Sequence, residues 1–222
     1  MAEFDVVEIF ESINGEGRFA GELATFVRLK GCNLCCSYCD TSWASDRDAP
    51  CEVMTEEQIA EKLLQSGIKR VTLTGGEPLA HPHIEVLLER LSQEKGLKVE
   101  IETNGSVPIA KFHNDTNRPT FTVDYKLPGS GMEERMCTDN FRNIHFDDTV
   151  KFVISHKEDL ERAEHIIREY DLCARCAVIF SPAFGAIEPV EIVDFLRDKC
   201  LNDVRLQLQL HKFIWNPQKR GV

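Results

Sequence analysis

The chain has 222 residues, of which 42% are hydrophobic and 28% charged, and it carries a formal net charge of −11. This length suits one substantial domain, and the composition is ordinary for a globular protein, which excludes disordered and collagen-like classes. No apolar run reaches the length of a membrane span, and the acidic balance disfavours binding to nucleic-acid phosphates. We therefore expect a small-molecule substrate, with no nucleic-acid partner and no membrane association.

Short β-type runs alternate with helical patterns along the chain. The runs that we interpret as strands are 24–29, 71–74, 99–103, 121–124, 150–154, 177–180 and 204–210. Capping-box patterns at 55–58 and 155–158 predict helix starts between them, as does a first-turn proline at Pro189. Alternating strands and helices predict parallel strands, and these are too few for a closed eight-stranded barrel. We expect an α/β fold, a partial (open) parallel β/α barrel of about six core strands with helices outside.

Polar motifs follow three of these strands, at 74–78, 102–105 and 124–126. Because parallel strands end at one edge of a sheet, the motifs should face one cavity. The segment 126–148 has no clear periodicity, and we interpret this long irregular stretch as a lid. We expect residues 1–222 to form a single domain.

Four of the nine cysteines fall within eight residues of one loop. Cys32, Cys36 and Cys39 have the spacing C-x3-C-x2-C, which suits three irons of a cubane 4Fe-4S cluster and leaves the fourth iron open for another ligand. The adjacent Cys35 would not give this spacing, so we favour Cys36 as the second ligand.

Other interpretations of the cysteine loop are weaker. Nine is an odd number for a disulfide framework, and no hydrophobic signal segment follows the polar start, so we expect a cytoplasmic protein. A zinc site would need a distant pair such as Cys173 and Cys176, whereas a ferredoxin would normally supply four thiolates per cluster.

The cysteine loop, followed by Thr-Gly-Gly-Glu-Pro at a later strand end, resembles the radical S-adenosylmethionine (SAM) superfamily. The resemblance implies that the open iron binds the amino and carboxylate groups of SAM, and that reduction of the cluster splits SAM to give a 5′-deoxyadenosyl radical. It also implies the partial barrel fold of that superfamily.

Residues at the strand ends are the candidate cofactor ligands. Gly75 and Gly76 let a ligand approach the backbone, whose carbonyls accept hydrogen bonds from an ammonium group, and Glu77 adds charge. The Glu102 carboxylate suits ribose hydroxyls, and Lys126 suits the carboxylate of SAM. The other candidates are Asp124, Tyr125 and Ser181.

Further segments resemble the 7-carboxy-7-deazaguanine synthase family, namely 9–17, 26–32, 39–41, 74–78, 102–105 and 208–212. Members of that family are short homodimeric lyases that use magnesium. They contract the ring of 6-carboxy-5,6,7,8-tetrahydropterin, eliminate ammonia and release 7-carboxy-7-deazaguanine, a precursor of queuosine and other deazapurines. The resemblance therefore implies a 4Fe-4S cluster, SAM and Mg²⁺ as cofactors, with an external one-electron reductant of the flavodoxin or ferredoxin type.

The same resemblance implies substrate contacts in the first 22 residues and beyond. Ile13, Asn14 and Gly15 match a substrate-binding turn that is usually Leu-Gln-Gly, so that Asn14 presents its amide about one methylene less far. Arg28 suits the substrate carboxylate, which it can bind with a forked pair of hydrogen bonds. The list is completed by Thr74 as a further substrate contact and Thr41 as the oxygen ligand for Mg²⁺.

Two other functions remain open from the sequence. A glycyl-radical-activating enzyme would share the cysteine loop and the Gly-Gly-Glu motif, but it has little use for a small-molecule turn at 13–15. An iron-sulfur electron-transfer module would not need the SAM motif. We assign no catalytic acid or base from the sequence.

Overall fold

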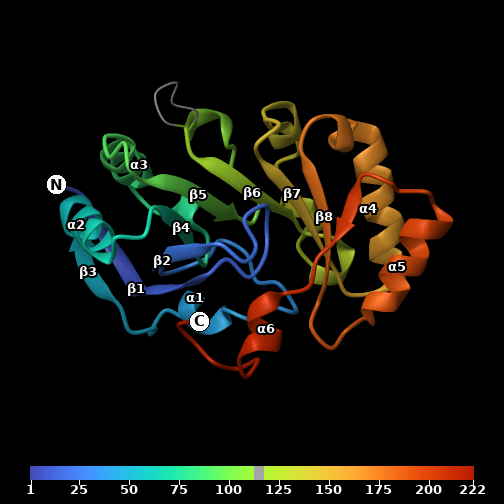
Figure 1. The fold of residues 1–222 in the computed structure, drawn as a ribbon, viewed down its shortest axis with the longest axis horizontal. Helices are drawn as coiled ribbons and strands as arrows, with labels where there is room; N and C mark the ends of the chain where they lie inside the picture. The colour runs from blue at the N-terminus through green and yellow to red at the C-terminus, as the bar shows by residue number, and fades with distance from the viewer. Residues whose placement is uncertain (113–117) are drawn as a thin grey trace.

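The computed structural model describes residues 1–112 and 118–222. Its centre is a nine-stranded sheet in the order β3-β1-β2-β4-β5-β6-β7-β8-β9, which curves into an open barrel (Figure 1). The parallel strands are β2 (Leu23–Leu29), β4 (Arg70–Gly75), β5 (Lys98–Thr103), β6 (Thr120–Tyr125), β7 (Thr149–Ile154), β8 (Ala177–Pro182) and β9 (Val204–Leu206). The predicted partial α/β barrel is confirmed.

Two antiparallel strands that the sequence pattern did not predict extend the sheet beyond β2. They are β1 (Glu3–Ile13), which pairs with β2, and the short β3 (Glu52–Thr55), which pairs with β1. The segment 1–22 is therefore mainly a strand followed by a turn, and it forms one wall of the open barrel.

The strands predicted from the sequence are all present, but the last one is shorter than expected. β9 ends at Leu206, whereas the prediction extended to Leu210, which instead begins a helix. The Gln207 side chain explains the early end. It accepts a hydrogen bond from the Gly17 N–H at 2.6 Å and donates one to the Gly17 carbonyl at 2.9 Å, which ties this part of the chain to the β1–β2 turn.

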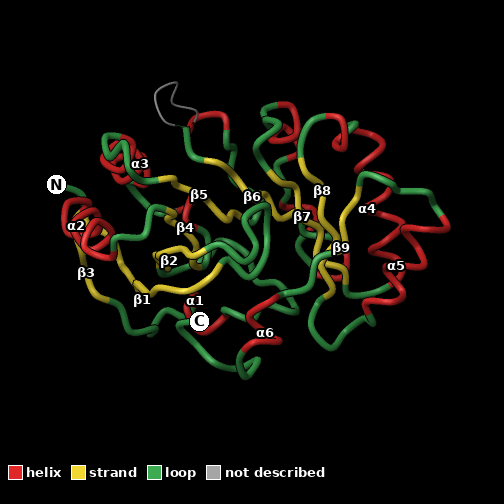
Figure 2. Tube along the Cα trace, viewed as in Figure 1, coloured by secondary structure: helices red, strands yellow, loops and turns green. Residues whose placement is uncertain are grey.

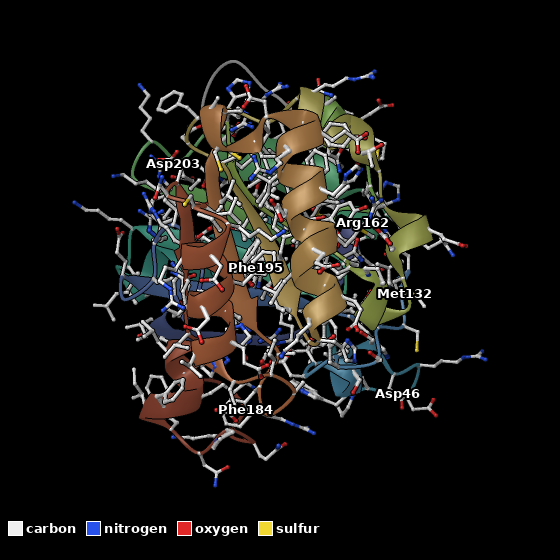
Figure 3. The ribbon with its side chains drawn as sticks, turned by 90° about the vertical axis from the view of Figure 1, so that its right-hand side faces the viewer. Asp46, Met132, Arg162, Phe184, Phe195 and Asp203 are labelled. Atoms are coloured by element: carbon white, nitrogen blue, oxygen red, sulfur yellow. The ribbon has the colours of Figure 1, made fainter. Side chains whose placement is uncertain are left out.

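Four longer helices cover the outer face of the sheet. They are α2 (Glu56–Ser66), α3 (Ile84–Ser92), α4 (Lys157–Tyr170) and α5 (Pro189–Asp198). The last two lie side by side over β7, β8 and β9 (Figure 3). Two short helices, α1 (Ser42–Ser45) and α6 (Leu210–Ile214), lie on the open side near the C-terminus (Figure 2).

The helix starts follow the sequence signals with one exception. Thr55 forms a capping box with Gln58, and Pro189 occupies the first turn of α5, as predicted. The box predicted at 155–158 is wrong, because the backbone and hydroxyl of Ser155 both donate to Asp159, at 2.9 and 2.6 Å, and α4 begins at Lys157.

The two faces of the strands have opposite character. Side chains that point towards the helices are apolar and buried, such as Leu73, Ile101, Phe152 and Phe180, each at most 1% exposed. The alternate positions point into the barrel and are largely polar. Because successive strand residues point to opposite faces, the same strands build the core and the site.

The segment 126–148 contains three short 3₁₀ turns, η3 (Pro128–Ser130), η4 (Glu133–Arg135) and η5 (Thr138–Arg142). Phe141 is buried in the core, and the Asn140 side chain bonds the backbone of 105, 107 and 109. The segment is thus anchored at its middle, and its movement as a lid stays a prediction. Among the described residues, no helix is both long and apolar enough to cross a membrane.

Candidate active site

A cavity of about 700 Å³ opens at the carboxyl ends of the parallel strands. Its walls come from β1, β2, β4, β5, β6 and β7, from the cysteine loop, and from the C-terminal part of the chain around α6. The motifs that the sequence placed at successive strand ends therefore meet in one space.

Three cysteines line this cavity, and they are the three with the predicted spacing, Cys32, Cys36 and Cys39. Cys35 is exposed outside it, where its N–H lies 3.5 Å from the Met132 sulfur. The choice of Cys36 over Cys35 thus agrees with the direction in which the loop presents its thiols.

The three thiols that line the cavity have the spacing of a cluster-binding loop. Within the described ranges, no three ligating side chains converge on one point as a mononuclear site requires. A cubane cluster instead presents separate iron corners, each with its own thiolate. Cys173 and Cys176 precede β8, at the opposite end of the barrel, so they do not complete a zinc site with the loop.

Burial raises the pKa of the Cys36 thiol to about 11 and also raises that of Cys32. Both groups therefore hold their protons until a metal displaces them. The buried ammonium of Lys126 acts in the opposite direction on Cys36 and would favour its thiolate.

The strand-end motif holds the cysteine loop in place through Gly76 and Glu77. The Gly76 N–H donates to the Leu29 carbonyl at 3.2 Å, and the Glu77 N–H donates to the Gly31 carbonyl at 2.8 Å. A Cβ on Gly76 would overlap the Gly31 carbonyl and lie 2.8 Å from the Cys32 nitrogen. The motif therefore needs glycine for contact between two backbones, and both glycines also line the cavity.

Glu77 does not take the place expected of it, because it lies outside the cavity lining and is only 2% exposed. Its oxygens accept hydrogen bonds from the Leu79 N–H, the Thr103 hydroxyl and the Asn104 N–H, at 3.0, 2.8 and 2.6 Å. Burial raises its pKa to about 7. The Glu77 side chain therefore fixes the turn after β5, and its contact with the cofactor stays a prediction.

At the end of β6, Asp124 and Lys126 line the cavity with an ion pair of 2.8 Å, but Tyr125 does not. Tyr125 is a core residue whose hydroxyl donates to Glu133 at 2.9 Å. Its side chain points away from the cavity because neighbouring strand residues point to opposite faces, so Tyr125 as a cofactor ligand stays a prediction that only its backbone could meet.

One Asp124 oxygen, Oδ1, is buried with no hydrogen-bond partner among the described residues. Buried polar atoms are normally satisfied, so this acceptor suits the donor groups of a polar ligand lying against the thiols. The amino group or hydroxyls of SAM are such donors. The site residues therefore fit that cofactor.

Glu102 and Thr74 also line the cavity from adjacent strands, and the Thr74 hydroxyl donates to Glu102 at 3.0 Å. Burial raises the pKa of Glu102, while Lys151 opposes the shift. Asn104 lines the same wall and donates to the Cys32 sulfur at 3.6 Å, a contact that the sequence did not reveal.

The predicted substrate turn is present, but its three residues differ in direction. Ile13 and Gly15 line the cavity, whereas Asn14 is fully buried beneath it and accepts a hydrogen bond from the Thr72 hydroxyl at 2.8 Å. The side-chain amide of Asn14 therefore points into the barrel interior and not into the cavity. Gly15 packs directly against the His211 ring, which leaves no room for a Cβ there.

Arg28 lines the cavity as expected, and its Nε donates to Glu8 at 2.8 Å. The guanidinium lies 5.8 Å from the centre of the Phe10 ring and 5.9 Å from that of Trp43. This pairing offsets the cost of burying its charge and orients it at the cavity wall.

A further ion pair of the site joins Glu16 and Lys151 at 3.2 Å, and the sequence reasoning missed both residues. Ser181 and Gln209 donate to Glu16 at 2.6 and 3.1 Å. Burial would raise the pKa of Glu16, but Lys151 and these hydrogen bonds outweigh it and lower the pKa to about 2. Glu16 also raises the pKa of the buried Lys151.

A signal for this pair was present in the sequence. Lys151 is a lone charge within an otherwise apolar strand, which is costly unless a partner lies inside the barrel. Ser181, a predicted cofactor ligand, is fully buried and lies outside the cavity lining, where it holds Glu16. It acts on the cavity through that carboxylate.

Thr41 lines the cavity beside Cys39, with its hydroxyl 3.7 Å from the Cys39 sulfur. It precedes α1 without capping that helix through its side chain. The hydroxyl is therefore available as an oxygen ligand, the type that Mg²⁺ prefers.

Comparisons with known proteins agree with this geometry. A model of the Radical SAM superfamily matches residues 26–125. The chain is 52% identical over 219 residues to a 7-carboxy-7-deazaguanine synthase of Clostridium acetobutylicum, with 99% of both chains covered. It is 37% identical to that of Chlorobaculum tepidum, with 100% of this chain and 98% of the relative covered.

Two solved structures share the fold. The crystal structure of QueE from Escherichia coli superposes with a TM-score of 0.72 at 21% identity, over 93% of this chain and 94% of that one. Streptococcus suis SuiB bound to S-adenosylmethionine superposes with a TM-score of 0.56 at 12% identity, over 80% of this chain and 48% of that one.

Proposed function

This chain belongs to the 7-carboxy-7-deazaguanine synthase family of radical SAM enzymes, and from that premise we propose a role for each part of the cavity. The protein is a lyase that converts 6-carboxy-5,6,7,8-tetrahydropterin to 7-carboxy-7-deazaguanine with loss of ammonia, a step of queuosine biosynthesis. Its cofactors are a 4Fe-4S cluster, SAM and Mg²⁺. When bound, the reduced cluster and SAM supply a 5′-deoxyadenosyl radical.

The cluster would be held by Cys32, Cys36 and Cys39, because these thiols alone among the loop cysteines line the cavity. Thr41 would give its hydroxyl to Mg²⁺, whose remaining ligands come mostly from water and the substrate. Both assignments place the metal groups at one wall of the cavity.

The cofactor SAM would lie along the strand ends. The backbone of Gly75 and Gly76 would accept hydrogen bonds from its amino group, Lys126 would meet its carboxylate, and Glu102 would accept from its ribose hydroxyls. The free acceptor on Asp124 supports this placement.

The pterin would occupy the wall formed by β1 and β2. Ile13 and Gly15 would present backbone groups to it, Arg28 would bind its carboxylate and Thr74 would contact the ring. We place Asn14 below the ring, holding the turn through Thr72. These contacts orient the substrate and exclude water while the cofactor's radical chemistry proceeds.

The observation that carries this proposal is the meeting of two sets of groups in one cavity, thiols for a cluster at one end and the buried Glu16–Lys151 pair deeper in the barrel. An activating enzyme for a partner protein needs an open groove for a peptide backbone. Here the C-terminal residues 217–222 line the cavity and leave room for a small molecule.

The direct test incubates anaerobic, cluster-reconstituted protein with 6-carboxytetrahydropterin, SAM, Mg²⁺ and a chemical reductant. We expect a product lighter than the substrate by ammonia. Cleavage of SAM without conversion of the pterin would instead favour an activating enzyme, and absence of SAM cleavage in a fully reconstituted sample would reject both enzymes in favour of an electron-transfer module.

We further propose that the protein works as a homodimer in the cytoplasm, with a flavodoxin or ferredoxin as its one-electron donor. The free cysteines among the described residues suit a reducing compartment. Size-exclusion chromatography with light scattering tests the dimer, and reduction of the cluster by purified flavodoxin or ferredoxin tests the donor.

A further inference from the structure

Glu100 is a carboxyl group one layer below the cavity that the proposed function does not use. It precedes Glu102 by two residues on β5 and points into the barrel, but it is only 2% exposed. Its Oε1 accepts a hydrogen bond from the Thr122 hydroxyl at 2.7 Å, whereas its Oε2 is buried and has no partner within the described part of the chain. An ionised carboxylate with an unsolvated oxygen is costly, so this site favours the protonated form.

The Thr122 hydroxyl connects this carboxyl to the cavity, because Thr122 itself lines the cavity wall. The backbone of Gly17 closes over the pair: a Cβ at that position would lie 3.1 Å from the Thr122 hydroxyl and 3.3 Å from Glu100 Oε1. Gly17 has a φ of 79°, so both its conformation and the space favour glycine. The two side chains are therefore held in a fixed arrangement.

The charged groups that face Glu100 come from three strands. Glu102 lies on the same strand, Arg70 on β4 and Lys151 on β7. Burial and the nearby Glu102 raise the pKa of Glu100 to about 7, against the hydrogen bond from Thr122 and the attraction of the two cations. Both protonation states are thus accessible near neutral pH.

Loss of ammonia needs a proton at the departing nitrogen, because an amine is a poor leaving group until it is protonated. The ion-paired groups of the cavity do not supply it readily. Glu16 is ionised, with a pKa lowered to about 2, and Lys126 and Lys151 hold their protons in ion pairs that raise their pKa values.

We propose that Glu100 is the proton reservoir for ammonia loss and acts through the Thr122 hydroxyl. The inference rests on the proposed function, which supplies the reaction that releases ammonia. Glu100 would therefore act indirectly and would not touch the substrate, because of these two residues only Thr122 lines the cavity.

The step balances without any oxidant or reductant. The Thr122 hydroxyl, which donates to Glu100 Oε1 in the structure, first turns its proton towards the leaving nitrogen and accepts a hydrogen bond from the protonated Oε1. The Glu100 carboxyl then gives its proton to the Thr122 oxygen while the Thr122 proton moves to the leaving nitrogen. The C–N bond then breaks with its electron pair on nitrogen, which departs as neutral ammonia. The ring loses one proton as its new double bond forms, and an equivalent proton from solvent restores the Glu100 carboxyl.

The test compares wild type with Glu100→Gln, Thr122→Val and Thr122→Ser in single turnovers with substrate deuterated at C6. We expect Glu100→Gln and Thr122→Val to slow ammonia release roughly 10²-fold at neutral pH, the scale of a lost proton donor. Thr122→Ser keeps the hydroxyl and should retain most of the rate. Transfer of deuterium from the substrate to SAM precedes ammonia loss and should persist in all three variants.

The pH dependence distinguishes proton transfer from packing. Wild-type ammonia release should fall as the pH rises above about 7, where Glu100 loses its proton, and Glu100→Gln should lack this limb. A resting-state infrared spectrum supplies a readout without turnover: at slightly acidic pH the wild type should show a protonated-carboxyl band that is missing from Glu100→Gln.

Wild-type rates of ammonia release in both Glu100→Gln and Thr122→Val would overturn the inference, as would absence of the carboxyl band. Should Glu100→Gln fail to fold, the contrast between Thr122→Val and Thr122→Ser decides, since equal rates in that pair reject a hydroxyl relay. Failure of the proposed function looks different, because the wild type itself would then transfer no deuterium and form no product.

Discussion

The two faces of the same parallel strands solve opposite physical problems. The outer face buries Leu73, Ile101 and Phe152 against helices, and these side chains need only a shape that packs well against their neighbours. The inner face carries the charged Lys151, which needs a specific partner at a defined distance, namely Glu16 of the β1–β2 turn at 3.2 Å. Stability therefore resides mainly on one side of a strand and chemistry on the other, separated by a single backbone.

The largest effect should come from removing a cluster ligand at the inner side. Cys36→Ala should lose reconstituted iron and all product formation, because two thiolates and an open site no longer hold the cluster. Cys35→Ala is the matched control, and it should keep both iron and activity since its thiol lies outside the cavity. Iron analysis after reconstitution measures the difference, and equal loss in the two variants would contradict the assignment.

On the outer face, Phe152→Ala should lower the free energy of unfolding by about 3 to 5 kcal/mol through loss of a buried ring. Phe152 is fully buried and packs on Tyr125 and Phe180, with ring centres 5.7 and 5.8 Å away. Denaturant unfolding of the apoprotein measures the cost. Phe152→Leu keeps much of the volume and should lose far less, whereas equal losses would speak against packing as the cause.

An inner-face change should stabilise the protein. Glu100 has a pKa of about 7 in place of 4.5, so the folded state loses stability as the pH rises through this interval, and below 4.5 the penalty is absent. At about 1.36 kcal/mol per unit the full penalty is about 3 kcal/mol. Above pH 7, Glu100→Gln should therefore have a higher denaturation midpoint than wild type. This difference in stability should vanish towards pH 4.5.

Denaturation midpoints of wild type and Glu100→Gln across that pH range test this result. Glu89→Gln, a change on the exposed side of α3, is a suitable control that should leave the curve unmoved. If the denaturation midpoints of Glu100→Gln and wild type differed by the same amount at all pH values, packing and not protonation of Glu100 would be the cause of the stability difference.

The smallest expected effect is on binding at the inner face. Glu102→Gln keeps an acceptor for the Thr74 hydroxyl but removes the charge offered to ribose hydroxyls. A hydrogen bond to a charged group is worth about 1.5 to 3 kcal/mol, so SAM affinity should fall roughly tenfold to 150-fold. Equilibrium binding to reconstituted protein measures this, and unchanged affinity would remove Glu102 from the ribose site.

The sequence revealed the outer face more completely than the inner one. Apolar periodicity located the strands and helices because helix-facing positions such as Phe180 follow simple burial rules. β1 was missed because an irregularity between Val6 and Glu8 interrupts its alternation and its role as a barrel wall depends on β2. The length of β9 was missed because Gln207 makes its contacts with a turn 190 residues away.

Within the site, the motifs located residues that line one cavity, but they did not reveal the direction of every side chain. Tyr125 and Glu77 stand within correct motifs and yet point into the protein. Lys151 stands out in the sequence only as a lone charge in an apolar strand, and its pairing with Glu16 becomes visible only in the folded chain. Such pairs need the three-dimensional structure because the β1–β2 turn and β7 are far apart both in the chain and in the sheet order.

The contact between Gly76 and the Gly31–Cys32 backbone has a consequence for the order of assembly. The cysteine loop is positioned by a strand more than forty residues further along the chain, which pairs with β2 only when the sheet has formed. We therefore expect the cluster to be added to an already folded chain, unlike zinc in small metal-dependent domains, where metal binding drives folding. The protein should therefore be obtainable as a folded, iron-free chain to which the cluster is added afterwards. The amount of cluster available to the protein should then limit its activity independently of how much protein is synthesised.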